Sequence, residues 1–418
     1  MAGILYGPSS FVVIPFSALL LMRKNHFIEI LLGFWFILIL SDATINSFQF
    51  AQTFKPFFIV ILALIFWLKR KAFFHFENTV FKLFLPFIIW SFVVIAISPE
   101  PFICFQKTLS YGLLLLIVPF IVSWAIKNDR REFYRGFILF GVFILTLGYL
   151  LYLVFPELTV LSDRYKAILG NPNGLGIFSM LLFILFEFSL SRDKTFFSKR
   201  EKWFIYIIII SSLLLSQTRS AIFAAGIYFV FSRIYFISGF FGFILFASIL
   251  VFYNEIAQQI IGFIQVLGLG EFFRLDTFSE GSGRWIAWQF AFSEIQNNIF
   301  VGKGFNYTEI LYKENYPILS RLGHEGNAHQ SFLTFWLDTG LVGLLSYSIA
   351  LFLCFWRGAK NTKLAWPILY AIVFSVSFES WLTASLNPFT IILFILISCM
   401  IIDVGAKEID YTTDIETS

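Results

Sequence analysis

The sequence predicts an all-α polytopic membrane protein with about 12–13 transmembrane helices and one long external loop that contains short helices. Composition is the first observation: of 418 residues, 58% are hydrophobic and only 13% are charged, whereas soluble globular proteins contain roughly 25% charged residues. The mean hydropathy of +0.82 agrees. The second observation is that the apolar residues fall in runs long enough to cross a bilayer, which takes about 20 residues. We expect residues 1–418 to form a single integral membrane domain.

About 13 apolar segments are candidate spans, and leaving out the first, which is the weakest, gives about 12. The N-terminus is interpreted as a first membrane segment, because it lacks the charged start and the cleavage site of a removed signal peptide. The three cysteines lie in or beside apolar runs and predict neither a disulfide framework nor a zinc site. The candidate spans are residues 4–22, 27–41, 54–68, 79–98, 108–126, 136–155, 173–191, 203–216, 220–237, 238–253, 332–356, 364–382 and 387–403.

Clusters of lysine and arginine set the predicted orientation. Taken through the spans in order, these clusters all fall on one side, which the positive-inside rule makes cytoplasmic. The opposite loops carry cations more sparsely, and an odd number of spans places the N-terminus outside. The clusters are Arg23–Lys24, Lys69–Lys71, Lys127 to Arg135, Arg192 to Lys202, Arg233, and Arg357 to Lys363.

The long external loop, residues 254–331, is the only long polar interval in the sequence. Apolar residues in its middle recur at the spacing of one helix face; they are Trp285, Trp288, Phe292 and Ile295. Two tryptophans on that face suit a helix in the lipid headgroup layer. Packing against neighbouring spans explains the pattern equally well, so both alternatives stay open.

Three arginines lie at external span or helix ends. Arg219 occupies a very short turn between two apolar segments, where it either reaches lipid headgroups or binds an anion. Arg284 follows Gly281-Ser282-Gly283 at a helix start, whose free backbone amides suit phosphate; the alternative is a simple helix cap. Arg164 precedes Asn171-Pro172-Asn173, in which either asparagine is a candidate cap and the proline suits the first helical turn.

His329 is the candidate general base. It precedes an apolar helix, and an ordinary imidazole pKa of about 6.5 suits proton transfer at neutral pH; the alternative is a structural histidine that caps or hydrogen-bonds the helix start. Glu325 is a second candidate base. His324 and His329 do not have the His-Glu-x-x-His spacing of a zinc helix, so we predict no metal and no cofactor.

These residues together predict one site. Arg164, Arg219 and Arg284 can converge with His329 at one membrane surface. Such an arrangement describes a pocket for a polyanionic lipid head, such as a diphosphate, beside a proton acceptor. Diphosphate is a tolerable leaving group once its charge is neutralised, and arginines can do this without a metal ion.

The pattern resembles the O-antigen ligase and O-antigen polymerase family of bacterial inner-membrane glycosyltransferases. The resemblance rests on short motifs that occur in the same order, and it departs from the family at Gln330, where asparagine is usual, and at Asn297-Asn298-Ile299, where a proline is common. The motifs are Arg164 with Asn171–Gly176, Gln217–Ala221, Ser282–Trp285, Val301–Gly304, Ala328–Leu333 and Asp338–Leu344.

The resemblance implies a metal-independent, inverting glycosyl transfer on the periplasmic face of the bacterial inner membrane, and it makes the long external loop 254–331 a periplasmic loop. The donor would be a polysaccharide or oligosaccharide on undecaprenyl diphosphate. The acceptor would be the lipid A core for a ligase, which the His329 motif favours, or the growing glycan for a polymerase. Arg219 and Arg284 match the family's diphosphate-binding arginines, Arg164 matches more weakly, and His329 matches its histidine, as catalytic base or acceptor-orienting group.

Two other classes of function compete with the glycosyltransferase. About twelve spans also suit a multispan transporter, but transporters often have paired halves and polar breaks near mid-membrane, and the sequence shows no such halves. The third alternative is an assembly subunit without catalysis. The expected partners are the lipid-linked glycan donor, the acceptor and membrane lipids, and we expect no nucleic acid.

Overall fold

The computed structural model describes residues 10–73, 77–234, 239–266, 268, 270, 284–322 and 326–402. These residues are mostly helical, which confirms the all-α polytopic membrane class. Within these ranges, five helices are long and apolar enough to cross a membrane, and shorter apolar helices accompany them. Within the described residues, every predicted span overlaps a helix or half of one.

The helices follow one another along the chain in three parts. The N-terminal part contains α2 (Ser10–Arg23), α3 (Phe27–Asp42), η2 (Asn46–Phe48), α4 (Gln49–Leu68), α5 (Arg70–Phe73), α6 (Thr79–Val94), η3 (Ile95–Ile97), α7 (Pro101–Val154) and α8 (Pro156–Thr159). The middle contains β1 (Val160–Leu161), β2 (Arg164–Tyr165), α9 (Pro172–Arg192), η4 (Lys194–Phe196), α10 (Lys199–Leu215), α11 (Arg219–Ile234) and α12 (Gly239–Val251). The C-terminal part contains α13 (Tyr253–Val266), α14 (Arg284–Asn297), α15 (Tyr307–Glu314), α16 (Tyr316–Arg321), α17 (Ser331–Gly358), α18 (Ala365–Phe378), η7 (Trp381–Thr383) and α19 (Thr390–Ile402).

Helix α7 accounts for two of the predicted spans. Asp129 has non-helical backbone angles, φ −151° and ψ 82°, which break α7 into two segments. The Asp129 carboxylate accepts a hydrogen bond from the backbone N–H of Glu132 at 2.8 Å, as a cap at the start of the second segment does. A capping aspartate inside a charged stretch therefore explains the reversal between the spans at 108–126 and 136–155.

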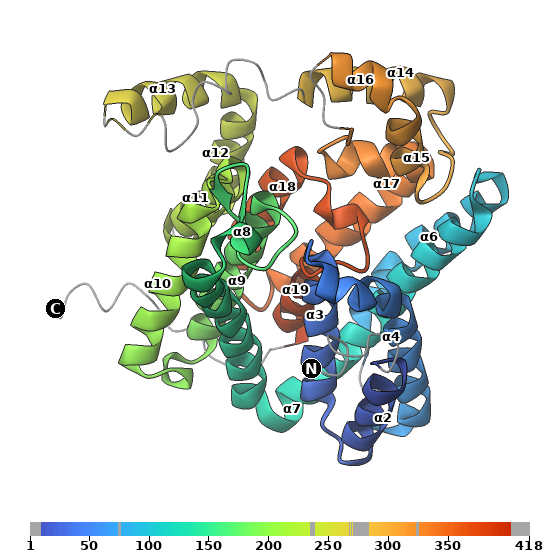
Figure 1. Cartoon of the computed structure of the whole chain (residues 1–418), viewed down its shortest axis with the longest axis vertical. Helices are drawn as coiled ribbons and strands as arrows, with labels where there is room; N and C mark the ends of the chain where they lie inside the picture. The colour runs from blue at the N-terminus through green and yellow to red at the C-terminus, as the bar shows by residue number, and fades with distance from the viewer. Residues whose placement is uncertain are drawn as a thin grey trace.

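Helices α9 and α19 form the centre of the molecule (Figure 1). All residues of α9 from Gly174 to Arg192 are buried, and α9 packs against α7, α10, α11 and α19. An apolar helix that is buried all round is a core helix, not one that faces lipid. The two-residue strands β1 and β2 pair antiparallel, Val160 with Tyr165 and Leu161 with Arg164, just before α9 begins.

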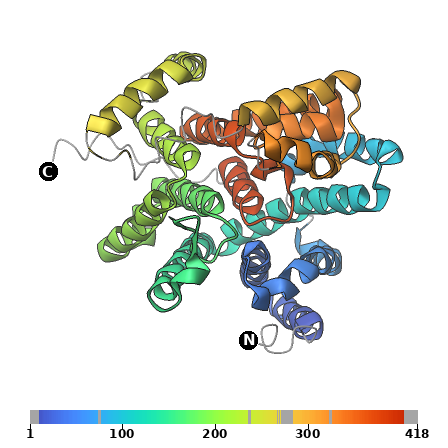
Figure 2. The same ribbon diagram turned by 45° about the horizontal axis from the view of Figure 1, so that its top comes forward.

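The loop helices α14, α15 and α16 gather over one end of α17 (Figure 1). Turned toward the reader in Figure 2, these orange helices lie beside the red C-terminal helices. They share a second apolar cluster with α17, separate from the main core. Its members are Ala287, Ala291, Ile295, Leu311, Tyr312, Leu319, Ala328, Leu333 and Leu337.

The predicted helix in the loop is confirmed as α14, but its predicted apolar face is wrong in part. Ala287, Ala291 and Ile295 face the cluster, while the rings of Trp285 and Phe292 are 64% and 48% exposed. Small alanines allow α14 to approach α17 closely, so the contact face follows residue size and not hydrophobicity alone. The helix packs on its neighbours and also leaves large apolar rings available at its outer side.

The predicted cation clusters meet at one end of the helices. Lys69 donates to the Asn25 side chain at 2.9 Å, Arg135 pairs with Glu201 at 2.8 Å, and Arg192 donates to the backbone carbonyl of Asn361 at 3.4 Å. The loops of the other end, which carry fewer cations, hold the predicted site. This segregation agrees with the charge asymmetry; that the cation-rich end is cytoplasmic stays a prediction.

Candidate active site

The site begins at the N-terminus of α9. Asn171 is the helix cap, and its side chain accepts a hydrogen bond from the N–H of Gly174 at 2.8 Å, with Pro172 at the first helical position. The predicted cap is therefore confirmed at Asn171. Asn173 has a different role, because its amide joins two charged side chains from distant parts of the chain.

Arg164 holds the start of α9 and the turn before α11 together. Its guanidinium donates to the backbone carbonyl of Ser216 at 2.8 and 3.1 Å, and to Asn173 Oδ1 and Thr218 Oγ1, both at 3.0 Å. Thr218 in turn donates to the carbonyl of Pro172 at 2.9 Å. With these donors committed to protein atoms, Arg164 positions the site.

The second predicted arginine, Arg219, is the first residue of α11. It follows Thr218, which Arg164 contacts, and precedes the buried Ser220. Gln217 has a positive φ of 51°, so the chain turns sharply before the helix begins. Arg219 is thus fixed at the helix end that the sequence predicts, next to residues bonded to α9.

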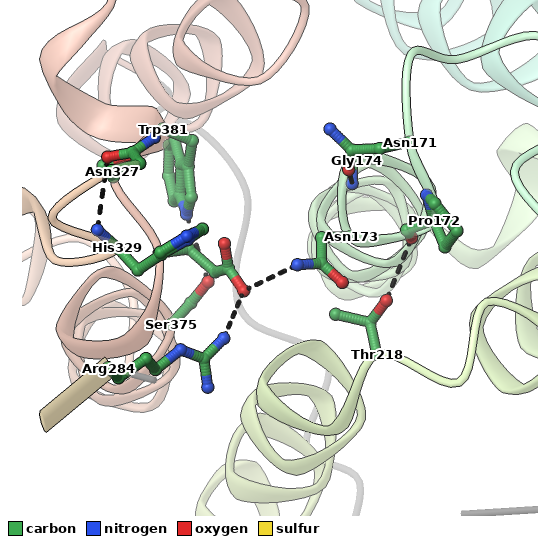
Figure 3. A network of polar contacts seen from close by, with 12 residues as sticks. Asn171, Pro172, Asn173, Gly174, Thr218, Arg284, Asn327, His329, Ser375 and Trp381 are labelled. Carbon is green, nitrogen blue, oxygen red and sulfur yellow. Dashed lines mark hydrogen bonds and ion pairs between the residues drawn. The ribbon is translucent and has the colours of Figure 1, made fainter. Parts of the chain in front are cut away.

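A buried carboxylate joins the arginines. Arg284, the first residue of α14, donates to Glu379 Oε1 at 3.0 Å, and Asn173 donates to the same oxygen at 3.3 Å. Glu379 is 6% exposed, and burial raises its pKa to about 7, although the charges of Arg284 and Arg164 lower it. The predicted convergence of Arg164 and Arg284 is therefore present, through Asn173 and Glu379. Figure 3 shows the side chains of Arg284 and Asn173 reaching toward one another.

Sequence reasoning missed Glu379. It falls inside the predicted span 364–382, but α18 ends at Phe378 and leaves Glu379 in the connection to α19. An isolated acid within an apolar run is itself a signal of function, because a charge there is costly unless it is paired. That signal was available at Glu379.

His329 lies beside this chain of polar contacts. Its backbone N–H donates to Asn327 Oδ1 at 3.2 Å, and its φ is +47°. The cap of α17 is the neighbouring Gln330, whose side chain accepts from the N–H of Leu333 at 3.2 Å. In Figure 3, His329 lies between Asn327 and Arg284. His329 is half-buried and is not the cap.

Two further contacts fix the His329 segment to its surroundings. Ser331 Oγ donates to the backbone carbonyl of Glu379 at 2.8 Å, and Trp288 Nε1 donates to the carbonyl of Ala328 at 3.1 Å. The histidine segment is therefore attached both to the residue that pairs with Arg284 and to the helix that Arg284 begins. Other predicted residues, Glu325 and His324 among them, and Gly281-Ser282-Gly283, lie outside the described residues.

Two of the motifs that carry the resemblance pack directly on each other. Gly340 interrupts α17 with φ 70° and ψ 180°, and the freed backbone pairs with residues 299–304. Gly304 N–H donates to the Asp338 carbonyl at 2.6 Å, and Leu341 N–H to the Ile299 carbonyl at 2.9 Å. A side chain at Gly302, whose φ is +70°, would meet the backbone of Asp338 and Gly340. Both glycines are therefore required by this close approach.

Within the described residues, no group of three or more His, Cys, Asp or Glu side chains is placed to hold a metal ion. The charges available at the site come from arginine, glutamate and histidine. This arrangement can bind an anion through fixed cations and can accept a proton close by.

Residues 204–348 match the family described as O-antigen ligase. The matched segment contains Arg219, Arg284 and His329, and it ends within α17. Glu379 and Arg164 lie outside it. No curated protein matches the chain.

Proposed function

Since residues 204–348 match the family described as O-antigen ligase, we propose that this multi-pass membrane protein transfers a glycan from undecaprenyl diphosphate to an acceptor hydroxyl on the periplasmic face of the bacterial inner membrane. Within the family we propose a ligase with the lipid A core as acceptor. The Ala328–Leu333 motif, which contains His329, supports the ligase over a repeat-unit polymerase. The observation that carries the proposal is the chain of contacts Arg284–Glu379–Asn173–Arg164 beside His329.

Arg284 and Arg219 bind the donor diphosphate in this proposal. Both are the first residues of helices, where backbone N–H groups add to their charge. The guanidinium forks neutralise the charge that develops on the leaving diphosphate, so the reaction needs no metal ion. Arg164 keeps the Arg219 turn in place through Ser216 and Thr218.

Glu379 occupies Arg284 before the donor arrives. Arg284 is partly buried, where an arginine without a counter-ion is costly, and the carboxylate supplies one at 3.0 Å. When the diphosphate binds Arg284, the proximity of two anions favours protonation of Glu379. Glu379 thus holds the Arg284 guanidinium in a defined position before the donor binds. Once Glu379 is protonated and neutral, it no longer competes strongly with the diphosphate for Arg284.

His329 accepts the proton of the acceptor hydroxyl. The hydroxyl oxygen forms a bond to the anomeric carbon while the bond from that carbon to the diphosphate oxygen breaks, and undecaprenyl diphosphate leaves with the electron pair. Attack opposite the leaving group inverts the anomeric configuration. A positioned base contributes about 10²–10⁴-fold to such a step.

The location of the polar residues supports the enzyme over the transporter. The site lies where helices begin and end at one end of the bundle, whereas transporters place their substrate sites near the bilayer midplane at broken helices. The break in α17 at Gly340 pairs its freed backbone with residues 299–304. The break therefore holds in place the loop that carries Arg284, and it does not line a transport path.

The test is glycan transfer by the purified protein in proteoliposomes with an undecaprenyl-diphosphate-linked glycan as donor and lipid A core as acceptor. His329→Ala should lower the turnover rate by about 10²-fold or more and leave donor binding intact. Arg284→Ala should weaken donor binding. Arg321→Ala, an exposed arginine of α16 at the same end, is the matched control and should behave as wild type. Full transfer by both site variants would reject the proposed function.

A further inference from the structure

A cavity of about 610 Å³ opens next to the site, and none of the site residues Arg164, Arg219, Arg284, His329 or Glu379 lines it. Its walls come from α15, the start of α16, the first turns of α17 and the connection between α18 and α19. The volume is in the range of about 300–1,000 Å³ that is usual for small-molecule sites. The cavity is therefore large enough for sugar residues and separate from the anion-binding arginines.

The lining combines aromatic rings with amide and hydroxyl groups. Trp381 and Tyr316 contribute rings, and Asn306, Asn387 and Thr383 contribute hydrogen-bonding groups. A sugar presents apolar C–H faces together with many hydroxyls, so it needs rings to pack on and partners that both donate and accept. This mixture suits a saccharide better than a lipid chain.

A charged pair on the wall adds fixed polar groups. Lys107 contacts Glu309 and Asn306 Oδ1, each at 2.6 Å, and Asn306 donates to Glu100 at 2.8 Å. The ammonium group offers donors and the carboxylate offers acceptors within one connected network. Neighbouring hydroxyls of a sugar ring are the ligand that such adjacent donors and acceptors fit.

The cavity reaches the histidine segment through shared residues. Asn327 Oδ1 accepts from the His329 N–H at 3.2 Å and from Ser380 Oγ at 3.3 Å, and both Asn327 and Ser380 line the cavity. Figure 3 shows Asn327 and Trp381 on the side of His329 opposite Arg284. In an inverting displacement, the attacking oxygen and the leaving diphosphate are on opposite sides of the anomeric carbon. With the diphosphate bound at Arg284, the attacking hydroxyl would have to come from the side on which the cavity lies.

We propose that this cavity binds the terminal sugar residues of the acceptor and presents one of their hydroxyls to His329. The inference rests on the proposed glycosyltransferase function and adds an acceptor subsite to it. The donor glycan has the same sugar chemistry, so the experiment has to separate the two sources.

Ala384→Trp is the test variant, because Ala384 is exposed and lines the cavity, and an added ring there fills the opening. Transfer is measured in detergent. The acceptor concentration is varied at saturating donor, and the donor concentration is then varied at saturating acceptor. We expect the acceptor KM to rise about tenfold or more, which corresponds to the loss of a few polar contacts, while the donor KM stays within about twofold. Ser293→Trp, at an exposed position of α14 outside the cavity, is the matched control and should change neither constant.

Lys313→Trp blocks the cavity from the α15 wall and provides a second variant should Ala384→Trp fail to fold. A rise in the donor KM alone would assign the cavity to the donor glycan and overturn the proposal, and so would unchanged constants in both variants. Saturation-transfer NMR with lipid-free core oligosaccharide gives a readout that needs no turnover. Contact with the wild-type protein that is lost in Ala384→Trp supports the subsite even if transfer fails, and absence of contact rejects it.

Discussion

Replacing Glu379 by glutamine should abolish a pH dependence of donor binding. The Glu379 carboxylate is buried against Arg284 at 3.0 Å, and its pKa is raised to about 7 by that burial. Glutamine keeps the size of the side chain and an oxygen for Asn173, but it carries no charge. The substitution therefore removes the titration and preserves most of the packing.

The magnitude follows from the pKa. If the diphosphate binds Arg284 only when Glu379 is neutral, the competent fraction is about 0.9 at pH 6 and about 0.1 at pH 8. The apparent Kd of the donor should therefore be about tenfold larger at pH 8 than at pH 6 in the wild type. The sign is fixed because raising the pH ionises Glu379, which restores the ion pair with Arg284 and places a negative charge beside the donor.

The assay is equilibrium binding of an undecaprenyl-diphosphate-linked glycan to purified protein between pH 6 and 8. An imidazole also titrates in this range, so the series is repeated in a His329→Ala background, where the slope should persist. Glu379→Gln should bind with the same affinity at all pH values. A flat wild-type profile, or a slope that survives in Glu379→Gln, would refute the competition between Glu379 and the diphosphate.

Three further outcomes are expected. Arg284→Lys should lose most donor binding because an ammonium group lacks the guanidinium fork; wild-type affinity would show that charge alone suffices. Gly302→Ala should lower the Tm clearly, since a side chain at φ +70° also meets the backbone of α17, whereas Gly226→Ala, with open space around it, should not; equal Tm values would contradict the docking argument. Because the native cysteines are buried, an impermeant thiol reagent on intact cells should label a cysteine at Lys313 and not one at Lys199, and the reverse pattern would overturn the orientation.

The sequence by itself determined the features that depend on local pattern. Long apolar runs predict spans wherever they occur, because a bilayer accepts only segments whose backbone is satisfied internally. A cap at Asn171 or Asn173, the helix beginning at Arg284 and the position of Arg219 at a helix end also follow from neighbouring residues, although only the structure distinguishes Asn171 from Asn173 as the cap. The motif order, including His329, indicates the family without any contact being known.

Only the tertiary structure decided what these residues touch. Glu379 is 95 positions from Arg284 along the chain, and no periodicity relates them; packing of α18 against α11 and α17 brings the carboxylate to the arginine. The sequence predicts tryptophans on the contact face of α14, whereas the structure places alanines there. How closely α14 approaches α17 depends on the residues of both helices, which a pattern within α14 does not show. The positioning role of Arg164 could not be predicted either. It depends on a hydrogen bond to the backbone carbonyl of Ser216, and every residue type has such a carbonyl. Local chemistry specifies where helices begin and end, whereas the site arises from long-range packing that places those ends together.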